Sequence, residues 1–352
     1  MRETTMLAAR FYAPLDLRIE EVPIPQPGPG EALVKVGAAT TCGTDLKAYR
    51  RGHPLLFKNL PAPFGHEVAG TVIAVGARVQ RFQPGTRVVI ANSAPCNRCF
   101  FCQRGRQSLC EDLLLLNGAY ADYILVPERI VEYNLWELPA GLSFVNAAIT
   151  EPLACALHGI EASDIHPGDC VVIIGGGPLG LLLLAVAKLK GARVILCGRG
   201  DERLAAARDL GADEIIDARQ FGDTEAEVAA VRARTDAQRG ADVVIEAVGT
   251  PELWEAAAQM ARRGGLVNFF GGCASGTSIT LETQPIHYGE LTFKGVFHHT
   301  PYYFSTALSL IAQQRIPVAR LISGSFPLRG LHEAFERLQR HQGIKYAILP
   351  GE

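Results

Sequence analysis

A glycine-rich segment between two apolar, β-favouring runs constrains the fold of this 352-residue chain more than any other stretch. Val171–Ile174 favour a strand, residues 175–180 read GGGPLG, and an apolar helical run then leads to a second β-favouring run at Val194–Cys197. In such a loop the first glycine permits a tight turn, the second lets a pyrophosphate approach the backbone, and the third lets helix pack on strand. The flanking strand and helix favour a dinucleotide site over an ordinary glycine-rich loop. The residues predicted to contact the cofactor are Gly175, Gly177, Pro178, Leu179, Gly180 and, at the end of a later predicted strand, Val248.

The order of predicted elements indicates two domains. Short strands separated by turns precede the glycine-rich segment, and strands alternate with helices after it, which is typical of a parallel sheet covered on both faces. The last elements of the chain are too few to fold alone, so we expect them to return to the N-terminal part. The predicted fold class is α/β, with a β-rich domain at 1–155 and 300–352 and a doubly wound parallel-sheet domain at 156–299.

Four cysteines in the pattern Cys96-x2-Cys99-x2-Cys102-x7-Cys110 give the strongest single signal. Four thiolates can surround one tetrahedral Zn²⁺ and leave no coordination position open, as in a structural zinc site. A redox CxxC pair needs only two cysteines, and an iron–sulfur cluster usually belongs to a one-electron carrier. We therefore expect a closed, structural zinc site.

A second group of possible metal ligands is scattered along the chain. Cys42, His66, Glu67 and Glu151 each have an ordinary explanation when taken singly, as a small buried residue, a core histidine or surface carboxylates. Together they offer one sulfur, one nitrogen and one or two oxygens, the set that a catalytic zinc with an open position requires.

Composition narrows the class of partner. The net charge is −2 and charges of both signs are interspersed, so neither a nucleic-acid nor an anionic-membrane footprint is visible, and small molecules are the expected partners. Nine cysteines, an odd number, in a sequence without a recognisable secretion signal predict reduced thiols and metal ligands, hence a cytoplasmic protein.

The CGTD, GHE, four-cysteine, EPLA and GGGPLG segments, in this order, resemble the zinc-containing medium-chain dehydrogenase/reductase superfamily, especially its polyol (sorbitol) and threonine dehydrogenase branch. The resemblance implies a GroES-like catalytic domain, a Rossmann domain, one catalytic and one structural zinc, and a homodimer or homotetramer. It implies that Cys42 and His66 bind the catalytic zinc, with either Glu67 or Glu151 as a further ligand.

The expected chemistry follows from charge. An alcohol oxygen at the open position of the zinc would lose its proton more easily and then expel hydride onto a nicotinamide. Thr44 is the predicted hydroxyl relay for that proton, a role compatible with that of a turn residue that satisfies nearby backbone. Many relatives carry histidine where this chain has Lys47, which weakens a threonine dehydrogenase assignment.

Two further positions bear on substrate and cofactor. His298 and His299 stand where sorbitol dehydrogenases carry an Arg-Tyr pair that reaches substrate hydroxyls, so they are either substrate contacts or surface histidines. Gly198 occupies the position of the acidic residue that marks NAD, and the cations Arg199 and Arg203 suit the 2′-phosphate of NADP. In the alternative, Asp201 binds the ribose of NAD.

The sequence thus predicts a zinc-dependent oxidoreductase that transfers hydride between a secondary alcohol, polyol or sugar-alcohol-like, and NAD(P), with NADP favoured. An NADPH-dependent ketone or aldehyde reductase and a threonine dehydrogenase-like enzyme are alternatives within the class. A nucleotide-binding structural protein that has lost turnover is the alternative outside it.

Overall fold

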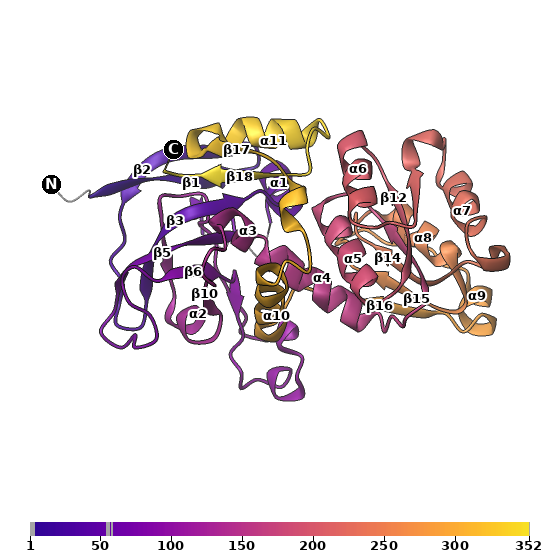
Figure 1. Cartoon of the computed structure of the whole chain (residues 1–352), viewed down its shortest axis with the longest axis horizontal. Helices are drawn as coiled ribbons and strands as arrows, with labels where there is room; N and C mark the ends of the chain where they lie inside the picture. Colours follow the sequence, from indigo (N-terminus) through magenta and orange to yellow (C-terminus); the bar gives the residue numbers. More distant parts are fainter. Residues whose placement is uncertain (1–3, 54–56, 58, 352) are drawn as a thin grey trace. The chain divides into compact units, whose positions relative to one another are not determined.

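The computed structural model describes residues 4–53, 57 and 59–351, and the chain separates into two compact units (Figure 1). The β-rich unit comprises Met1–Ala154 and His299–Glu352, and the parallel-sheet unit comprises Cys155–His298. Helix α4 (Thr150–Ala162) carries the chain from the first unit into the second.

The β-rich unit is built on a seven-stranded sheet of order β10-β6-β5-β3-β18-β17, with β9 also paired to β3. The central strand β3 runs antiparallel to β5 and to the C-terminal strand β18. The predicted return of the C-terminal segment to the N-terminal part is therefore confirmed. The strands of this sheet are β3 (Ala32–Thr40), β5 (Val68–Val75), β6 (Arg87–Ile90), β9 (Tyr123–Val126), β10 (Leu135–Glu137), β17 (Ile322–Pro327) and β18 (Lys345–Leu349).

A smaller three-stranded sheet of order β2-β1-β4 and several helices complete this unit. Helix α11 contacts β17 and β18, and its apolar face joins an aromatic core in which Phe64 lies 6.1 Å from both Tyr120 and Phe335, measured between ring centroids. This core supports the loop that precedes β5. The remaining elements are β1 (Thr5–Ala13), β2 (Asp16–Pro23), β4 (Ala62–Pro63), β7 (Ser93–Ala94), β8 (Leu114–Leu115), α1 (Gly43–Arg51), α2 (Glu128–Tyr133), α3 (Phe144–Ala148), α10 (Pro301–Ala312) and α11 (Leu331–Gln339).

The parallel-sheet unit contains six strands in the order β13-β12-β11-β14-β15-β16, all parallel. Strands β11, β12 and β14 are nearly continuous apolar runs with both faces buried, as expected for a sheet covered on two sides. The prediction of a doubly wound α/β fold is confirmed. The strands are β11 (Cys170–Ile174), β12 (Arg193–Gly198), β13 (Glu214–Asp217), β14 (Ala241–Glu246), β15 (Ala261–Phe269) and β16 (Thr292–Gly295).

Strand order fixes where a ligand can bind in this unit. The chain passes from β11 to β12 on one side and later resumes at β14 on the other, so the connections diverge beside the carboxyl end of β11. In open parallel sheets, ligands bind at such a switch point. The helices are α5 (Pro178–Leu189), α6 (Asp201–Asp209), α7 (Thr224–Arg232), α8 (Pro251–Met260) and α9 (Thr283–Tyr288).

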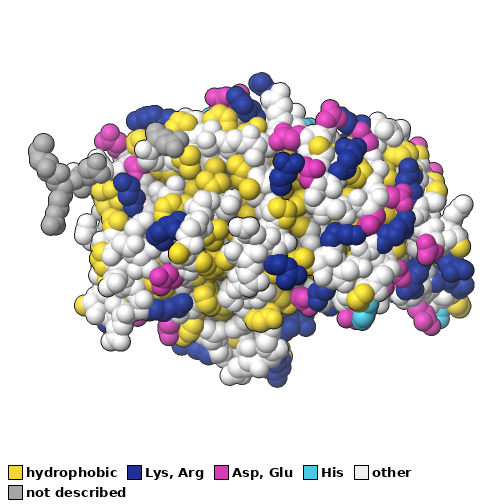
Figure 2. Space-filling model, viewed as in Figure 1, with side chains coloured by type: hydrophobic (Ala, Val, Ile, Leu, Met, Phe, Trp, Pro, Cys, Tyr) yellow, Lys and Arg dark blue, Asp and Glu magenta, His cyan; other side chains and the backbone are white. Residues whose placement is uncertain are grey.

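Within the described part of the chain, no helix combines the length and hydrophobicity needed to cross a bilayer. On the face shown in Figure 2, acidic and basic side chains are intermixed rather than gathered into a field of one sign.

Candidate active site

Cys42 lies where strand β3 gives way to helix α1. Its backbone is extended (φ −119°, ψ 147°), and its sulfur accepts a hydrogen bond from the backbone N–H of Thr44 at 3.4 Å, so it caps the helix. This hydrogen bond fixes where the sulfur lies at the start of α1. The sulfur can therefore serve as a metal ligand from a fixed position.

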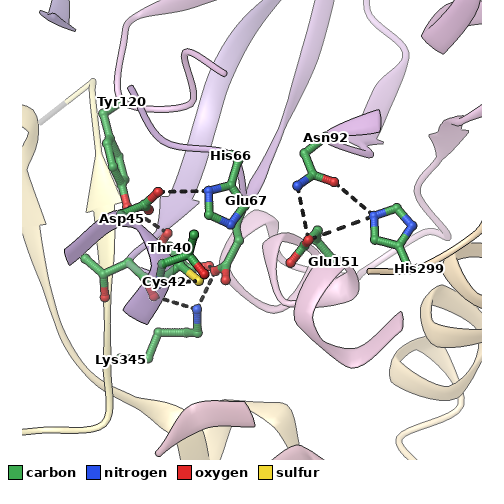
Figure 3. Close-up of polar contacts among 12 residues, drawn as sticks. Thr40, Cys42, Asp45, His66, Glu67, Asn92, Tyr120, Glu151, His299 and Lys345 are labelled. Carbon is green, nitrogen blue, oxygen red and sulfur yellow. Dashed lines mark hydrogen bonds and ion pairs between the residues drawn. The ribbon is translucent and has the colours of Figure 1, made fainter. Parts of the chain in front are cut away.

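The imidazole of His66 is held by a buried carboxylate from helix α1. Its Nδ1 lies 2.8 Å from Oδ1 of Asp45, and both residues are buried (Figure 3). Because an ionised carboxylate can only accept, Nδ1 carries a hydrogen, and Nε2 is the ring atom that a metal ion could occupy. Burial alone would lower the pKa of His66, but the negative charges of Asp45 and Cys42 raise it and prevail, so this pKa lies well above 6.5. The surroundings of this ring thus favour a positive charge.

Glu67 is fully buried, and its two oxygens differ in their partners. Oε2 accepts from the hydroxyl of Thr40 and from Nζ of Lys345, which also donates to the Thr41 carbonyl at 2.6 Å. Oε1 has no hydrogen-bond partner among the described residues. A buried carboxylate oxygen without a partner is costly unless a cation or water meets it.

One ligand atom from each of Cys42, His66 and Glu67 lies within 4.8 Å of the others. Sulfur, nitrogen and oxygen in this arrangement could hold one zinc ion with a position left open, and the unpartnered oxygen of Glu67 is the atom that such an ion would satisfy. Glu151 is not part of this group. Figure 3 shows it apart, with Asn92 and His299.

Asn92, Glu151 and His299 form a second buried network in the β-rich unit. The side-chain amide of Asn92 donates to Oε1 of Glu151 at 3.1 Å, and Oδ1 of Asn92 lies 2.9 Å from Nε2 of His299. His299 is 1% exposed, so the surface interpretation is wrong for this residue. His298, in the parallel-sheet unit, is partly exposed and accepts a hydrogen bond from the ring of His158 through its carbonyl, at 2.8 Å.

Thr44 and Lys47 are exposed positions of helix α1. They are three residues apart and therefore lie on neighbouring turns of one face. Residues that sequence reasoning missed are Asp45, Asn92, Tyr120 and Lys345. Asp45 could have been found, because it belongs to the CGTD segment. No motif in the sequence marks the other three.

The four-cysteine segment folds into a compact lobe. One sulfur from each cysteine lies within 4.8 Å of the other three, and backbone N–H groups point at the sulfurs, for example Cys96 N–H to Cys110 at 3.2 Å. Backbone N–H donors lower the pKa of Cys99 to about 6, whereas burial and neighbouring sulfurs raise the pKa of Cys102 to about 12. This set could enclose one zinc ion completely. The prediction of reduced thiols in this lobe agrees with four free cysteines.

The glycine-rich loop has the geometry that its sequence predicts. Gly175 has φ +122°, and a Cβ on Gly180 would lie 1.8 Å from the Gly175 carbonyl oxygen, so both positions require glycine. A Cβ on Gly177 would meet nothing within 4 Å, which leaves the start of α5 open to a phosphate. Val248 lies against the turn, with Cγ2 3.0 Å from a Cβ placed on Gly175.

The end of β12 explains the glycine at 198. A Cβ there would lie 2.9 Å from Cα of Gly176, so the backbone leaves no room for a carboxylate side chain. Arg203 projects from α6 with its Cβ 3.8 Å from a Cβ placed on Gly176, and burial lowers its pKa. Its neighbour Arg199 is exposed.

Asp201, the residue that would bind the ribose of NAD in the alternative interpretation, is 2.6 Å from Arg219 Nη2. That guanidinium also binds Asp217 at the end of β13. Asp201 is therefore already paired with a cation.

Both units are similar to known proteins. Residues 28–139 match the family model "Alcohol dehydrogenase GroES-like domain", and residues 178–313 match "Zinc-binding dehydrogenase". Sorbitol dehydrogenase from Bacillus subtilis is 32% identical, with 98% of this chain and 97% of that protein covered. Sorbitol dehydrogenase from Bos taurus is 31% identical, with 97% and 95% covered.

Among solved structures, a zinc-binding dehydrogenase from Sinorhizobium meliloti with bound NADP superimposes with a TM-score of 0.89. It is 32% identical, and the match covers 99% of this chain and 100% of that one. These similarities run through both units rather than through one motif.

Proposed function

The chain belongs to the zinc-dependent medium-chain dehydrogenase/reductase family of alcohol and polyol dehydrogenases, and from that premise we propose that it interconverts a secondary hydroxyl of a polyol and the corresponding ketone, with NADP as hydride carrier. The observation that carries the proposal is the group of Cys42, His66 and Glu67, in which His66 and Glu67 are buried and one Glu67 oxygen has no partner among the described residues.

These three residues are the proposed ligands of the catalytic zinc, and Glu67 is preferred to Glu151. When bound with one position open, zinc acts as a Lewis acid that lowers the pKa of a coordinated oxygen, from about 15.7 to about 7 in the case of water. The chain contributes fixed ligand geometry. The helix start holds the sulfur of Cys42, Asp45 holds the ring of His66, and Lys345 holds the carboxylate of Glu67.

We assign the proton released by the alcohol to Thr44 and Lys47. The Thr44 hydroxyl can accept that proton and donate its own, and its exposure at the first turn of α1 opens a path to water. Lys47, exposed one turn further along the same face, is the next hydrogen-bonding group on that path.

For the substrate, the relatives named sorbitol dehydrogenase support a polyol. We propose that Glu151 and the histidines at 298 and 299 serve its hydroxyls. His299 would act by orienting Asn92, to which it is hydrogen-bonded and which in turn donates to Glu151.

NADP is proposed over NAD on three observations in the parallel-sheet unit. Gly198 excludes the carboxylate that would bind a free ribose, Arg203 lies beside the glycine-rich loop, and Asp201 is paired with Arg219. When bound, NADP would supply the hydride acceptor for alcohol oxidation, and NADPH would supply the hydride for ketone reduction. Because NADPH usually serves reduction in cells, ketone reduction is the favoured alternative direction.

The structural zinc, the oligomeric state and the location in the cell are further parts of the proposal. The four-cysteine lobe is the proposed structural zinc site, with Cys96, Cys99, Cys102 and Cys110 as ligands. A homodimer or homotetramer and a cytoplasmic location are predictions from the resemblance and from the cysteine content.

The test is turnover of the zinc-loaded enzyme on polyols, simple primary alcohols, cyclitols and threonine, with NADP⁺ and NAD⁺ in parallel. We expect kcat/KM to be highest for a polyol and higher with NADP⁺ than with NAD⁺. Failure to oxidise any alcohol, or failure of the corresponding ketones to be reduced by NADPH, would contradict the proposal. A clear preference for threonine would contradict the polyol assignment.

A further inference from the structure

Tyr120 completes a buried chain of hydrogen bonds that ends at His66. Its side chain is 0% exposed, and its hydroxyl lies 2.6 Å from Oδ2 of Asp45, whose other oxygen is 2.8 Å from Nδ1 of His66. Figure 3 shows Asp45 between Tyr120 and His66. The sequence brings them together from separate segments, because Tyr120 lies 75 residues from Asp45.

The hydroxyl hydrogen of Tyr120 has two possible acceptors. The Thr40 carbonyl lies 3.1 Å away and the Asp45 carboxylate only 2.6 Å away. Hydrogen bonds to an ionised acceptor are shorter and about twice as strong as neutral ones, so the hydrogen goes to Asp45. Both oxygens of that carboxylate then have a donor, and its orientation is fixed.

Tyr120 also holds the backbone just before His66. A Cβ placed on Gly65, which has φ +87°, would lie 2.6 Å from the Tyr120 ring, so the ring packs directly on this glycine. The backbone N–H of Tyr120 donates to Phe64 at 3.1 Å, and that of Gly118 donates to Gly65 at 2.8 Å. The ring and backbone therefore position the His66 main chain, while the hydroxyl positions its imidazole.

We propose that Tyr120 is a positioning residue for the catalytic zinc: through Asp45 it fixes the tautomer and the orientation of His66, and so sets how tightly the chain holds the ion. This inference rests on the proposed zinc site. Removal of partners that orient metal-binding histidines typically costs about 10- to 100-fold in metal affinity. Tyr120 acts one bond further out, so we expect about tenfold, at the lower end of that range.

Tyr120→Phe separates the two roles, because it keeps the ring on Gly65 and the backbone pairing but removes the hydroxyl. Zinc affinity is measured by competition with a chromophoric chelator, and the site is also read from the visible spectrum of the cobalt-substituted protein. We expect the zinc ion at Cys42, His66 and Glu67 to bind about tenfold less tightly in Tyr120→Phe than in the wild-type protein. The cobalt spectrum of this site should change as well.

Tyr346→Phe is the matched control. It removes the hydroxyl of another buried tyrosine, which donates to the Gln342 carbonyl at 3.2 Å in the same unit, and it should leave affinity and spectrum unchanged. Wild-type affinity and an unchanged cobalt spectrum in Tyr120→Phe would overturn the inference.

Asp45→Asn tests the same chain of bonds independently, should Tyr120→Phe fold poorly. It must weaken zinc binding at least as much, and Tyr120→Phe must add little in the Asp45→Asn background, because both changes break one path. Full zinc affinity in Asp45→Asn, or fully additive losses, would overturn the inference. A different result would contradict the proposed function itself: a wild-type protein that binds no metal outside the four-cysteine lobe.

Discussion

Lys345 donates a hydrogen bond to the carboxylate of Glu67 across 278 residues of sequence, and both side chains are almost completely buried. Lys345 begins the C-terminal strand β18, which pairs with β3 just before the segment that carries Cys42. The end of the chain thus supplies the countercharge of the candidate metal site.

This pairing predicts a large cost when one partner is removed. Lys345→Met leaves the Glu67 carboxylate buried without its cation, and we expect the free energy of unfolding to fall by about 3–5 kcal/mol. Denaturant unfolding of the metal-free protein measures it. The double variant Lys345→Met with Glu67→Gln should recover most of the loss. Arg78→Ala, which breaks an exposed pair with Glu128, should change stability by no more than about 1 kcal/mol. Equal effects for Lys345→Met and Arg78→Ala would show that the buried pair has no special role.

The four-cysteine lobe should contribute to stability rather than to chemistry. Cys99→Ser removes one thiolate from a closed set, so we expect loss of one zinc ion and a lower Tm, because the binding free energy of a structural zinc is folding free energy. Metal analysis and thermal unfolding check both effects. Cys170→Ser, which changes a thiol outside both proposed zinc sites, should change neither zinc content nor Tm appreciably. An unchanged zinc content in Cys99→Ser would refute the structural assignment.

Cofactor preference should depend on the arginines beside the glycine-rich loop. Arg203→Ala and Arg199→Ala should each raise the KM for NADP⁺ by about tenfold, the equivalent of one charge-assisted hydrogen bond, and leave the KM for NAD⁺ nearly unchanged. Arg208→Ala, an exposed arginine further along α6, is the control. If NADP⁺ binding survives both of the first two changes, the 2′-phosphate is bound elsewhere or NAD is the natural cofactor.

Gly198 should be needed for either cofactor. A methyl group there would lie 2.9 Å from Cα of Gly176, so Gly198→Ala must displace the loop that receives the pyrophosphate. We expect weaker binding of both NADP⁺ and NAD⁺ in direct titrations. Gly222→Ala, where a Cβ meets nothing within 4 Å, should bind both normally. Wild-type affinities in Gly198→Ala would show that the close approach to Gly176 is not needed for binding.

Local sequence was enough to predict the features that depend on neighbouring residues. Short-range spacing indicates the strand, glycine turn and helix around Gly175, and the clustering of the four cysteines. Strand β15 begins at Ala261, although its first residues include Arg262, Arg263 and two glycines, which do not have the apolar pattern of a buried strand.

The contacts that complete the site depend on how strands pair over long distances. No spacing in the sequence indicates that Lys345 reaches Glu67, that Tyr120 reaches Asp45, or that Asn92 joins Glu151 to His299. For the same reason the sequence left Glu67 and Glu151 as equal candidates. Only the folded β-rich unit places Glu67 with Cys42 and His66, and Glu151 with Asn92.

The role of Cys42 as a ligand of a second, catalytic zinc is tested most directly by zinc analysis. The measurement compares the zinc content of Cys42→Ser with that of the wild-type protein. We predict about two zinc ions per wild-type chain and about one in Cys42→Ser, which should lose turnover but still bind NADP⁺. A Cys42→Ser protein that keeps the wild-type zinc content and turnover would contradict the account.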